Sequence, residues 1–275
     1  MNRQRVLMCR PTYYAVEYRI NFYMHPDKER VNSSVAHDQW ETLYHLVRQV
    51  GFEVELINPH PAALDMVFTA NAGIVVPSQN SQKKFILPRF DPIERQIEEP
   101  LIERWALARG YEVVHLPANL QFEGEGDAFV LDNVIVGGYG IRSSLDGLEA
   151  VAKVAGMNLM PLRLCRPEWY HLDTCFTPLR RMDDGKWLVA YVPEAFDDKS
   201  VRQITETFNT IRVSEKEAKR LACNAVVKSD TVILPAGNGE FARELRQNGF
   251  TVYEAPMTEF LKSGGSCKCL VLYLD

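Results

Sequence analysis

Apolar positions along the chain follow two alternating spacings, and this alternation recurs five times. Apolar residues three and four apart, typical of a helix with one buried face, lead each time into a short strand-like run. The helix-like stretches are 38–50, 93–109, 145–155, 198–206 and 239–248. Four of them end at a glycine, at Gly51, Gly110, Gly156 and Gly249. Glycine tolerates the left-handed backbone that ends many helices, so these positions predict helix ends.

A second set of apolar runs follows a polar loop in each unit. These runs are 68–76, 127–137, 172–179 with 187–192, 222–234 and 268–272, and Val6–Cys9 supplements the last. Each unit therefore predicts strand, strand, helix and strand over about 40–60 residues. Such units cannot bury a core alone, so five of them are expected to close around a pseudo-symmetry axis where their loops meet.

Helix–glycine–strand patterns occur in many α/β proteins, so the closed arrangement depends on the five-fold recurrence. Neither βαβ order nor a glycine-rich phosphate loop is visible, which disfavours a dinucleotide-binding sheet.

Composition excludes several classes of protein. The 275 residues are 46% hydrophobic and 24% charged, as in ordinary globular proteins, and residues 1–275 are expected to form a single domain. A net charge of -5 argues against a nucleic-acid surface. No apolar stretch approaches the ~18 residues of a membrane span, and no signal peptide is visible. The six cysteines are irregularly spaced, which favours a cytoplasmic protein with reduced thiols.

Polar residues occupy the same place in every unit, just before the strand that follows the loop. They are Asp65, Asn71, Glu123, Glu125, Asp127, His171, Asp173, Asn224 and Cys267 or Cys269. A single one of them would be explained as a turn or cap residue. Five groups in register need a shared cause, and a central polar site is the simplest.

The residue types at this predicted site indicate its chemistry. A cysteine thiolate is a strong nucleophile, and a histidine can protonate a leaving group. Clustered carboxylates suit a planar cation such as a guanidinium. A papain-type cysteine segment and a Gly-x-Ser-x-Gly elbow are both missing, which argues against a protease or serine hydrolase. Cys267 and Cys269 have no partner pair for zinc, so no metal is expected.

Three segments, FEGEGD (122–127), HLDTCF (171–176) and GGSCKCL (264–270), resemble the signature segments of the guanidino-group-modifying enzymes, also called penteins. This superfamily includes arginine deiminase, dimethylarginine dimethylaminohydrolase, glycine amidinotransferase and arginine dihydrolase. The segments occur in the family's order and spacing. The resemblance implies an α/β fold, a five-bladed pseudo-symmetric propeller of ββαβ-type units, in agreement with the repeat.

The resemblance also implies roles for individual residues. Glu123 and Asp173 match the carboxylates that hold the guanidinium, and His171 matches the general acid/base. Cys269 matches the nucleophile, because the family cysteine typically precedes Leu or Met and another small or apolar residue. Cys267 is the alternative nucleophile, since alternation along a strand would place both thiols on one face.

The N-terminal half resembles the arginine dihydrolase-like branch. Asn21 matches an Asn-containing segment of that branch, and Asn71 replaces an aspartate usual in deiminases and dimethylarginine hydrolases. An amide can hydrogen-bond a neutral ureido group, which suits an enzyme that also holds citrulline. Arg142 resembles a residue that binds the substrate α-carboxylate, and Asp65 is also expected to bind substrate. Turn or strand-end hydrogen bonding is the competing explanation for both asparagines.

The activity this implies is hydrolysis of arginine, or a close relative, through a covalent thiouronium on cysteine. It could continue through citrulline to ornithine, ammonia and CO2. The alternatives are a dimethylarginine dimethylaminohydrolase, an arginine deiminase, an amidinotransferase and, most distantly, a non-catalytic pentein binding protein. No cofactor is implied, and a homodimer is common in the family. The loop 21–36 fits either a lid or a surface turn.

Overall fold

Each of five units along the chain forms one three-stranded sheet in the computed structural model, which describes residues 4–28, 30–77 and 83–275. The first and last segments of the chain share a sheet, ordered β15 (Leu272–Tyr273), β1 (Arg5–Cys9) and β2 (Glu53–Ile57). The others are β3 (Ile74–Val76), β4 (Lys84–Ile86), β5 (Glu112–Val114); β6 (Ala128–Leu131), β7 (Val134–Tyr139), β8 (Asn158–Arg163); β9 (Phe176–Arg181), β10 (Trp187–Tyr191), β11 (Asn209–Arg212); and β12 (Val226–Lys228), β13 (Thr231–Pro235), β14 (Thr251–Ala255).

Every sheet has the same internal order. Its central strand pairs antiparallel with one neighbour and parallel with the other. A helix joins each parallel pair: α1 (Ser33–Gln49), α2 (Glu98–Ala108), α3 (Leu145–Ala155), α4 (Asp198–Thr207) and α6 (Gly239–Gln247). The expectation that βαβ order is missing was therefore wrong, although each crossover lies within its own small sheet. The predicted ββαβ units and the α/β five-fold fold are confirmed.

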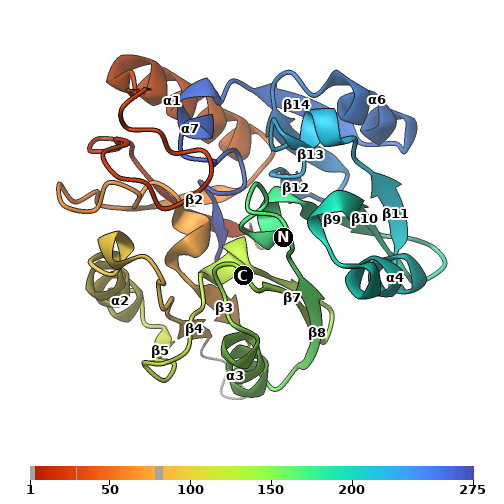
Figure 1. Ribbon diagram of the computed structural model, residues 1–275, viewed down its shortest axis with the longest axis horizontal. Helices are drawn as coiled ribbons and strands as arrows, with labels where there is room; N and C mark the ends of the chain where they lie inside the picture. The colour runs from red at the N-terminus through yellow and green to blue at the C-terminus, as the bar shows by residue number, and fades with distance from the viewer. Residues whose placement is uncertain (1–3, 29, 78–82) are drawn as a thin grey trace.

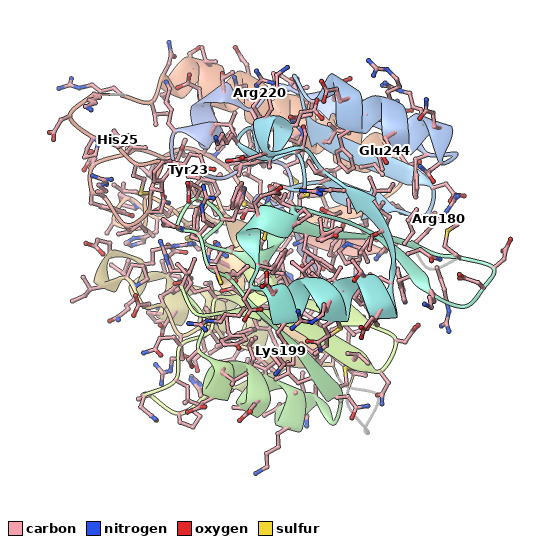
Figure 2. All side chains as sticks on the ribbon, turned by 45° about the vertical axis from the view of Figure 1, so that its right-hand side comes forward. Tyr23, His25, Arg180, Lys199, Arg220 and Glu244 are labelled. Carbon is pink, nitrogen blue, oxygen red and sulfur yellow. The ribbon has the colours of Figure 1, made fainter. Side chains whose placement is uncertain are left out.

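The helices lie at the periphery and the sheets nearer the centre (Figure 1). Charged side chains project from these outer helices, among them exposed Lys199 on α4 (Figure 2). Antiparallel pairing of Val6 with Tyr273 and Leu7 with Leu272 closes the ring of units. None of the described helices is long and apolar enough to cross a membrane.

The helix ends agree with the sequence pattern, whereas some starts do not. The four predicted glycines all have positive φ, from +67° at Gly156 to +98° at Gly51. Helix α1 begins at Ser33 instead of 38, because Asn32 accepts a hydrogen bond from the N–H of Val35 and caps it. The stretch predicted to be helical from 93 begins as a short 3-10 turn, η2 (Ile93–Arg95), and α2 follows it.

Tight turns, not strands, carry the polar residues of each unit. These are the 3-10 turns η1 (Thr69–Ala72), η3 (Gly124–Gly126) and η4 (Leu172–Thr174), and turns at 219–223 and 267–270. The predicted strands 68–76, 172–179, 222–234 and 268–272 consequently begin four to six residues late. The run 127–137 divides into β6 and β7, and 222–234 divides into β12 and β13. The remaining short elements are η5 (Pro193–Ala195), α5 (Glu215–Ala218) and α7 (Thr258–Leu261).

Candidate active site

The five tight turns bring their polar side chains together in the interior. Asn71 lies in η1, Glu123 precedes η3, and Asp173 lies in η4 with His171 before it. Asn224 directly follows the turn at 219–223, and Cys269 lies in the turn at 267–270. All six side chains are at most 2% exposed. The predicted convergence of one polar position from each unit is confirmed by their contacts.

Glu123 is the most heavily paired of these groups. One of its carboxylate oxygens lies 2.7 Å from His171 Nε2, and Arg142 Nη1 donates to both oxygens at 3.2 Å. The backbone N–H of Glu123 donates to Ser143 Oγ at 3.0 Å. Burial disfavours ionisation of this carboxyl, but Arg142 and His171 outweigh it and lower the pKa to about 2. Glu123 is therefore an anion at neutral pH.

Gly126 leaves room for the side chains of Asn71 and His171, which both pack against its backbone. A Cβ at position 126 would come within 2.2 Å of Asn71 Nδ2 and 3.3 Å of His171 Nδ1. Position 126 therefore has to be glycine, because a side chain there would displace Asn71 and crowd His171.

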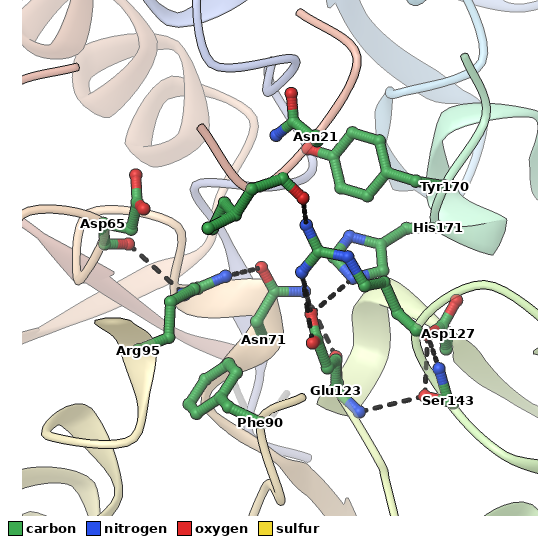
Figure 3. A network of polar contacts seen from close by, with 12 residues as sticks. Asn21, Asp65, Asn71, Phe90, Arg95, Glu123, Asp127, Ser143, Tyr170 and His171 are labelled. Atoms are coloured by element: carbon green, nitrogen blue, oxygen red, sulfur yellow. Dashed lines mark hydrogen bonds and ion pairs between the residues drawn. The ribbon is translucent and has the colours of Figure 1, made fainter. Parts of the chain in front are cut away.

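Asn71 joins Glu123 to a buried ion pair that the sequence analysis missed. Its Nδ2 donates to the Glu123 carbonyl at 3.1 Å, and its Oδ1 accepts from Arg95 Nη1 at 2.8 Å (Figure 3). Arg95 also forms two 2.8 Å hydrogen bonds to the Glu98 carboxylate. The spacing of Arg95 and Glu98, three apart in a helix-like stretch, was the available signal. Contact of Asn71 with substrate stays a prediction, since protein groups occupy both ends of its amide.

Cys269 lies against Asp173 and Asn224. Its Sγ is 3.4 Å from Asp173 Oδ2, and Asn224 Nδ2 donates to it at 3.0 Å. Asp173 Oδ1 is buried without a hydrogen-bond partner among the described residues. Burial and the adjacent Asp173 raise the pKa of Cys269 well above its usual value. Burial also raises the pKa of Asp173, so this part of the site disfavours negative charge until a cation arrives.

The two rival cysteines occupy different surroundings. Residues 267–270 form a turn and not a strand, so the expectation that both thiols share one face by alternation was wrong. Cys269 lines the pocket at the site, whereas the side chains that line it do not include Cys267. Burial raises the pKa of Cys267 to about 12. The geometry favours Cys269 as the reactive thiol.

The N-terminal segment closes the site from one side. Ile20, Asn21 and Met24 line the pocket, and the Ile20 carbonyl accepts from Arg142 Nη2 at 2.6 Å. The remaining space is about 10 Å³, which is roughly one water molecule. An amino acid can enter only if this cover moves. Of the lid expected at 21–36, residues 33–36 belong to α1, and residue 29 lies outside the described residues.

Asn21 anchors that cover to the cysteine loop. Its Nδ2 donates to the Ser263 carbonyl at 2.8 Å, and its Oδ1 accepts from the backbone N–H groups of Tyr23 and Met24. The competing explanation, turn hydrogen bonding, describes the contacts with Tyr23 and Met24, whereas the contact with Ser263 joins distant parts of the chain. A direct contact between Asn21 and substrate stays a prediction.

Asp65 also lines this pocket. Tyr18 donates its hydroxyl to Asp65 Oδ2 at 2.7 Å, while Asp65 Oδ1 is buried and has no partner in the described part of the chain. An unpaired buried carboxylate oxygen is costly, so this part of the pocket is complementary to an ammonium group.

Two acidic residues of the predicted cluster have other positions. Asp127 accepts from Ser143 Oγ at 2.6 Å and from the N–H of Leu172 at 3.1 Å, and so joins two units beside the site. Glu125 accepts from Lys268 Nζ at 2.9 Å and lines a separate cavity of about 270 Å³. Within the described ranges, no three His, Cys, Asp or Glu side chains gather in a metal-binding group.

Comparison with known proteins places this arrangement in a family. A family profile described as N,N dimethylarginine dimethylhydrolase, eukaryotic, matches residues 10–274. The dimethylarginine dimethylaminohydrolase of Mycobacterium tuberculosis is 33% identical over 270 residues, which cover 98% of this chain and 85% of that protein. The chain belongs to the dimethylarginine dimethylhydrolase family, within the pentein superfamily.

Two further comparisons are with an arginine dihydrolase of this superfamily. The bifunctional arginine dihydrolase/ornithine cyclodeaminase ArgZ of Synechocystis sp. is 40% identical over 274 residues, covering 98% of this chain and 37% of ArgZ. This chain therefore spans little more than a third of the length of ArgZ. A crystal structure of the N-terminal domain of ArgZ, with an asparagine-to-serine substitution and a covalently bound reaction intermediate, superposes with a TM-score of 0.90. That domain is 38% identical, and the match covers 99% of this chain and 98% of the domain.

Proposed function

We propose that this protein hydrolyses the guanidinium group of arginine, or a close relative, through a covalent intermediate on Cys269. The observation that carries the proposal is a buried thiol in the pocket, 3.4 Å from a carboxylate whose other oxygen has no partner among the described residues. A guanidinium supplies the missing donors and, at the same time, presents an electrophilic carbon to the sulfur. The covalent intermediate of the ArgZ domain supports the same chemistry.

Substrate binding exchanges one guanidinium for another. Arg142 now lies on Glu123, where the substrate is expected to bind. When the cover opens, Arg142 is released from Glu123 and from the Ile20 carbonyl, and it becomes available for the substrate α-carboxylate. Asp65, with its unpaired oxygen, then binds the α-ammonium, so both ends of the amino acid are recognised by charge.

The cation also activates the nucleophile. A guanidinium between Glu123 and Asp173 offsets the negative charge that raises the pKa of Cys269, so the thiolate forms when substrate is bound. The sulfur bonds to the guanidinium carbon, His171 protonates the departing nitrogen, and ammonia leaves a thiouronium on Cys269. Water deprotonated by His171 adds to that carbon, the C–S bond breaks, and a ureido product and thiolate result.

A second round on citrulline would yield ornithine, ammonia and CO2, as in an arginine dihydrolase. The higher identity to ArgZ, 40% against 33%, supports this choice over dimethylarginine hydrolysis. Asn71 in place of a carboxylate supports it too, because a neutral ureido group needs no extra anion. Deiminase and amidinotransferase activities use the same intermediate and are alternatives within the site.

The remaining expectations belong to the same proposal. Residues 1–275 would form one catalytic domain, of which 1–3, 29 and 78–82 lie outside the described residues. The protein would work in the cytoplasm, which suits its six unpaired thiols. A homodimer would be observed by light scattering.

Product analysis tests the proposal. Purified protein is incubated with arginine, citrulline, agmatine and dimethylarginine, and products are identified by mass spectrometry, with Cys269→Ser as the control. Two ammonia per arginine with ornithine supports the dihydrolase. One ammonia with citrulline indicates a deiminase, dimethylamine indicates a dimethylaminohydrolase, and amidino transfer to an added amine indicates a transferase. No turnover of any of the four, with no Cys269 adduct, would favour the non-catalytic alternative.

A further inference from the structure

Asn224 holds the fourth unit's position in the ring of polar residues, and its side-chain hydrogen bonds go to Asp173 and Cys269. It follows the turn at 219–223, precedes β12, and is fully buried. Its own N–H donates to the Leu221 carbonyl at 2.8 Å, which fixes the backbone of the turn. The side chain is therefore held rigidly toward the cysteine loop.

The amide of Asn224 contacts Cys269 at two points. Its Oδ1 accepts from the backbone N–H of Cys269 at 3.0 Å, and its Nδ2 donates to Cys269 Sγ at 3.0 Å. Nδ2 also donates to the Asp173 carbonyl at 3.2 Å. A backbone N–H can only donate and a carbonyl can only accept, so these two partners fix which end of the amide faces the sulfur.

We propose that Asn224 is a catalytic residue that stabilises the Cys269 thiolate through its Nδ2–H donor while it orients the sulfur through Oδ1. The inference rests on the proposed role of Cys269 as nucleophile. A donor aimed at the sulfur favours the charged form, because a hydrogen bond to an anion is stronger than one to a neutral thiol. Among the described residues, the side chain that donates a hydrogen bond to the sulfur is Asn224.

The other groups that face Cys269 have opposing effects. Burial and Asp173 disfavour the thiolate, and Tyr170 and Tyr23 lie near enough to interact with its charge. The backbone N–H of Ser266 and the Asn224 amide favour it. Before a cationic substrate binds, Asn224 is thus the side chain that limits how far the thiol pKa rises.

Replacement by aspartate separates this role from a merely structural one. Asn224→Asp keeps an acceptor for the Cys269 N–H but removes the donor to sulfur and adds negative charge. We expect the pH midpoint for alkylation of Cys269 by iodoacetamide, followed by mass spectrometry of the labelled peptide, to rise by roughly one to two units. At neutral pH kcat should fall about 10–100-fold with little change in KM, since Asn224 touches the sulfur and not the pocket wall.

Asn238 offers a matched control. It is also fully buried, donates from Nδ2 to the Pro235 carbonyl at 2.9 Å, and lies outside the site at the start of α6. Asn238→Asp should leave the alkylation midpoint and kcat unchanged. If Asn224→Asp does not fold, Asn224→Ser carries the same expectation, because its shorter hydroxyl cannot bridge both partners.

The outcomes separate this inference from the proposed function. An unshifted midpoint in a folded Asn224 variant overturns the inference, whether or not kcat falls, because a purely structural role would leave the thiol pKa in place. The inference is supported if the alkylation midpoint shifts in the Asn224 variant and stays unchanged in Asn238→Asp. Full turnover by Cys269→Ser would instead overturn the proposed function.

Discussion

The two carboxylates expected to hold the substrate guanidinium lie in opposite electrostatic surroundings. Glu123 is paired with Arg142 and His171, and its pKa is lowered to about 2. Asp173 lies beside the Cys269 thiol, burial raises its pKa, and one of its oxygens has no partner in the described part of the chain. The Glu123 end of the site is thus already charged, and its charge is paired. At the Asp173 end, negative charge becomes favourable only when a cation binds.

This difference suggests a division of labour. In the proposed mechanism, the Glu123 end would hold His171 in place for proton transfer before substrate binds. The Cys269 end would keep its thiol protonated until the substrate guanidinium supplies positive charge. Protecting a buried thiol in this way also limits its alkylation or oxidation by neutral reagents.

The largest expected effect comes from removing the sulfur itself. Cys269→Ser should lower kcat at least about 10⁴-fold, because a hydroxyl at this site is a far weaker nucleophile than a thiolate. Steady-state turnover of arginine measures it. Cys267→Ser, two residues away in the same turn, is the matched control and should retain turnover; the reverse pattern would assign catalysis to Cys267.

The next largest effect is expected at Glu123, whose charge is paired. Glu123→Gln removes the carboxylate that pairs with His171 and should lower kcat about 10²–10⁴-fold. The buried Glu217, which accepts from the backbone N–H groups of Glu240 and Phe241 outside the site, is the control. Glu217→Gln should lower the thermal unfolding midpoint and leave kcat in place. Equal kcat losses in both variants would contradict a specific role for Glu123.

A smaller effect is expected at Asp173, where a substitution should make Cys269 more reactive but weaken the binding of arginine. Asp173→Asn removes the negative charge that raises the pKa of Cys269, so this pKa should fall and iodoacetamide should react faster at neutral pH. KM for arginine should nevertheless rise about 10–100-fold, because a charge-assisted hydrogen bond to the guanidinium is lost. If reactivity toward iodoacetamide and affinity for arginine fall together, the proposed contrast between the two ends is wrong.

The smallest effect is expected at Tyr18, in the N-terminal segment that closes the site. Tyr18→Phe removes the 2.7 Å hydrogen bond to Asp65 and leaves this carboxylate poorly solvated. We expect KM for arginine to change about 2–10-fold with kcat preserved. Agmatine, which has an ammonium but no carboxylate, shows whether the change lies at the Asp65 end of the pocket. An altered kcat with unchanged KM would place Tyr18 in the chemistry and not in binding.

The repeat in the sequence predicted the fold well because its signals are local. Apolar spacing and the four helix-ending glycines depend on backbone geometry within a few residues, and the helices and ββαβ units agree with them. The parallel pairing within each unit was missed, since strand direction is set by a crossover in space. The turns η1 and η4 were predicted to be strands, because a buried turn and a buried strand both give a short apolar run in the sequence.

The site shows the same boundary between local and tertiary information. The motif FEGEGD, the segment HLDTCF and the final cysteine loop were sufficient to select Glu123, His171, Asp173 and Cys269 as candidates. Arg95 was missed, as was the pairing of Arg142 with Glu123. Arg95 pairs with Glu98 only three residues away, but its hydrogen bond to Asn71 and the pairing of Arg142 with Glu123 depend on how the turns pack in space.

The sequence alone determined which residue types recur at the same point of five units, and hence the chemistry available at the centre. Only the tertiary structure decided how that chemistry is divided. It placed Arg142 and His171 beside Glu123, left an oxygen of Asp173 without a partner among the described residues, and aimed the Asn224 amide at Cys269 while Cys267 stayed outside the pocket. The physical reason is that charge and hydrogen bonding act across distances of about 3–4 Å, and those distances are set by packing between units.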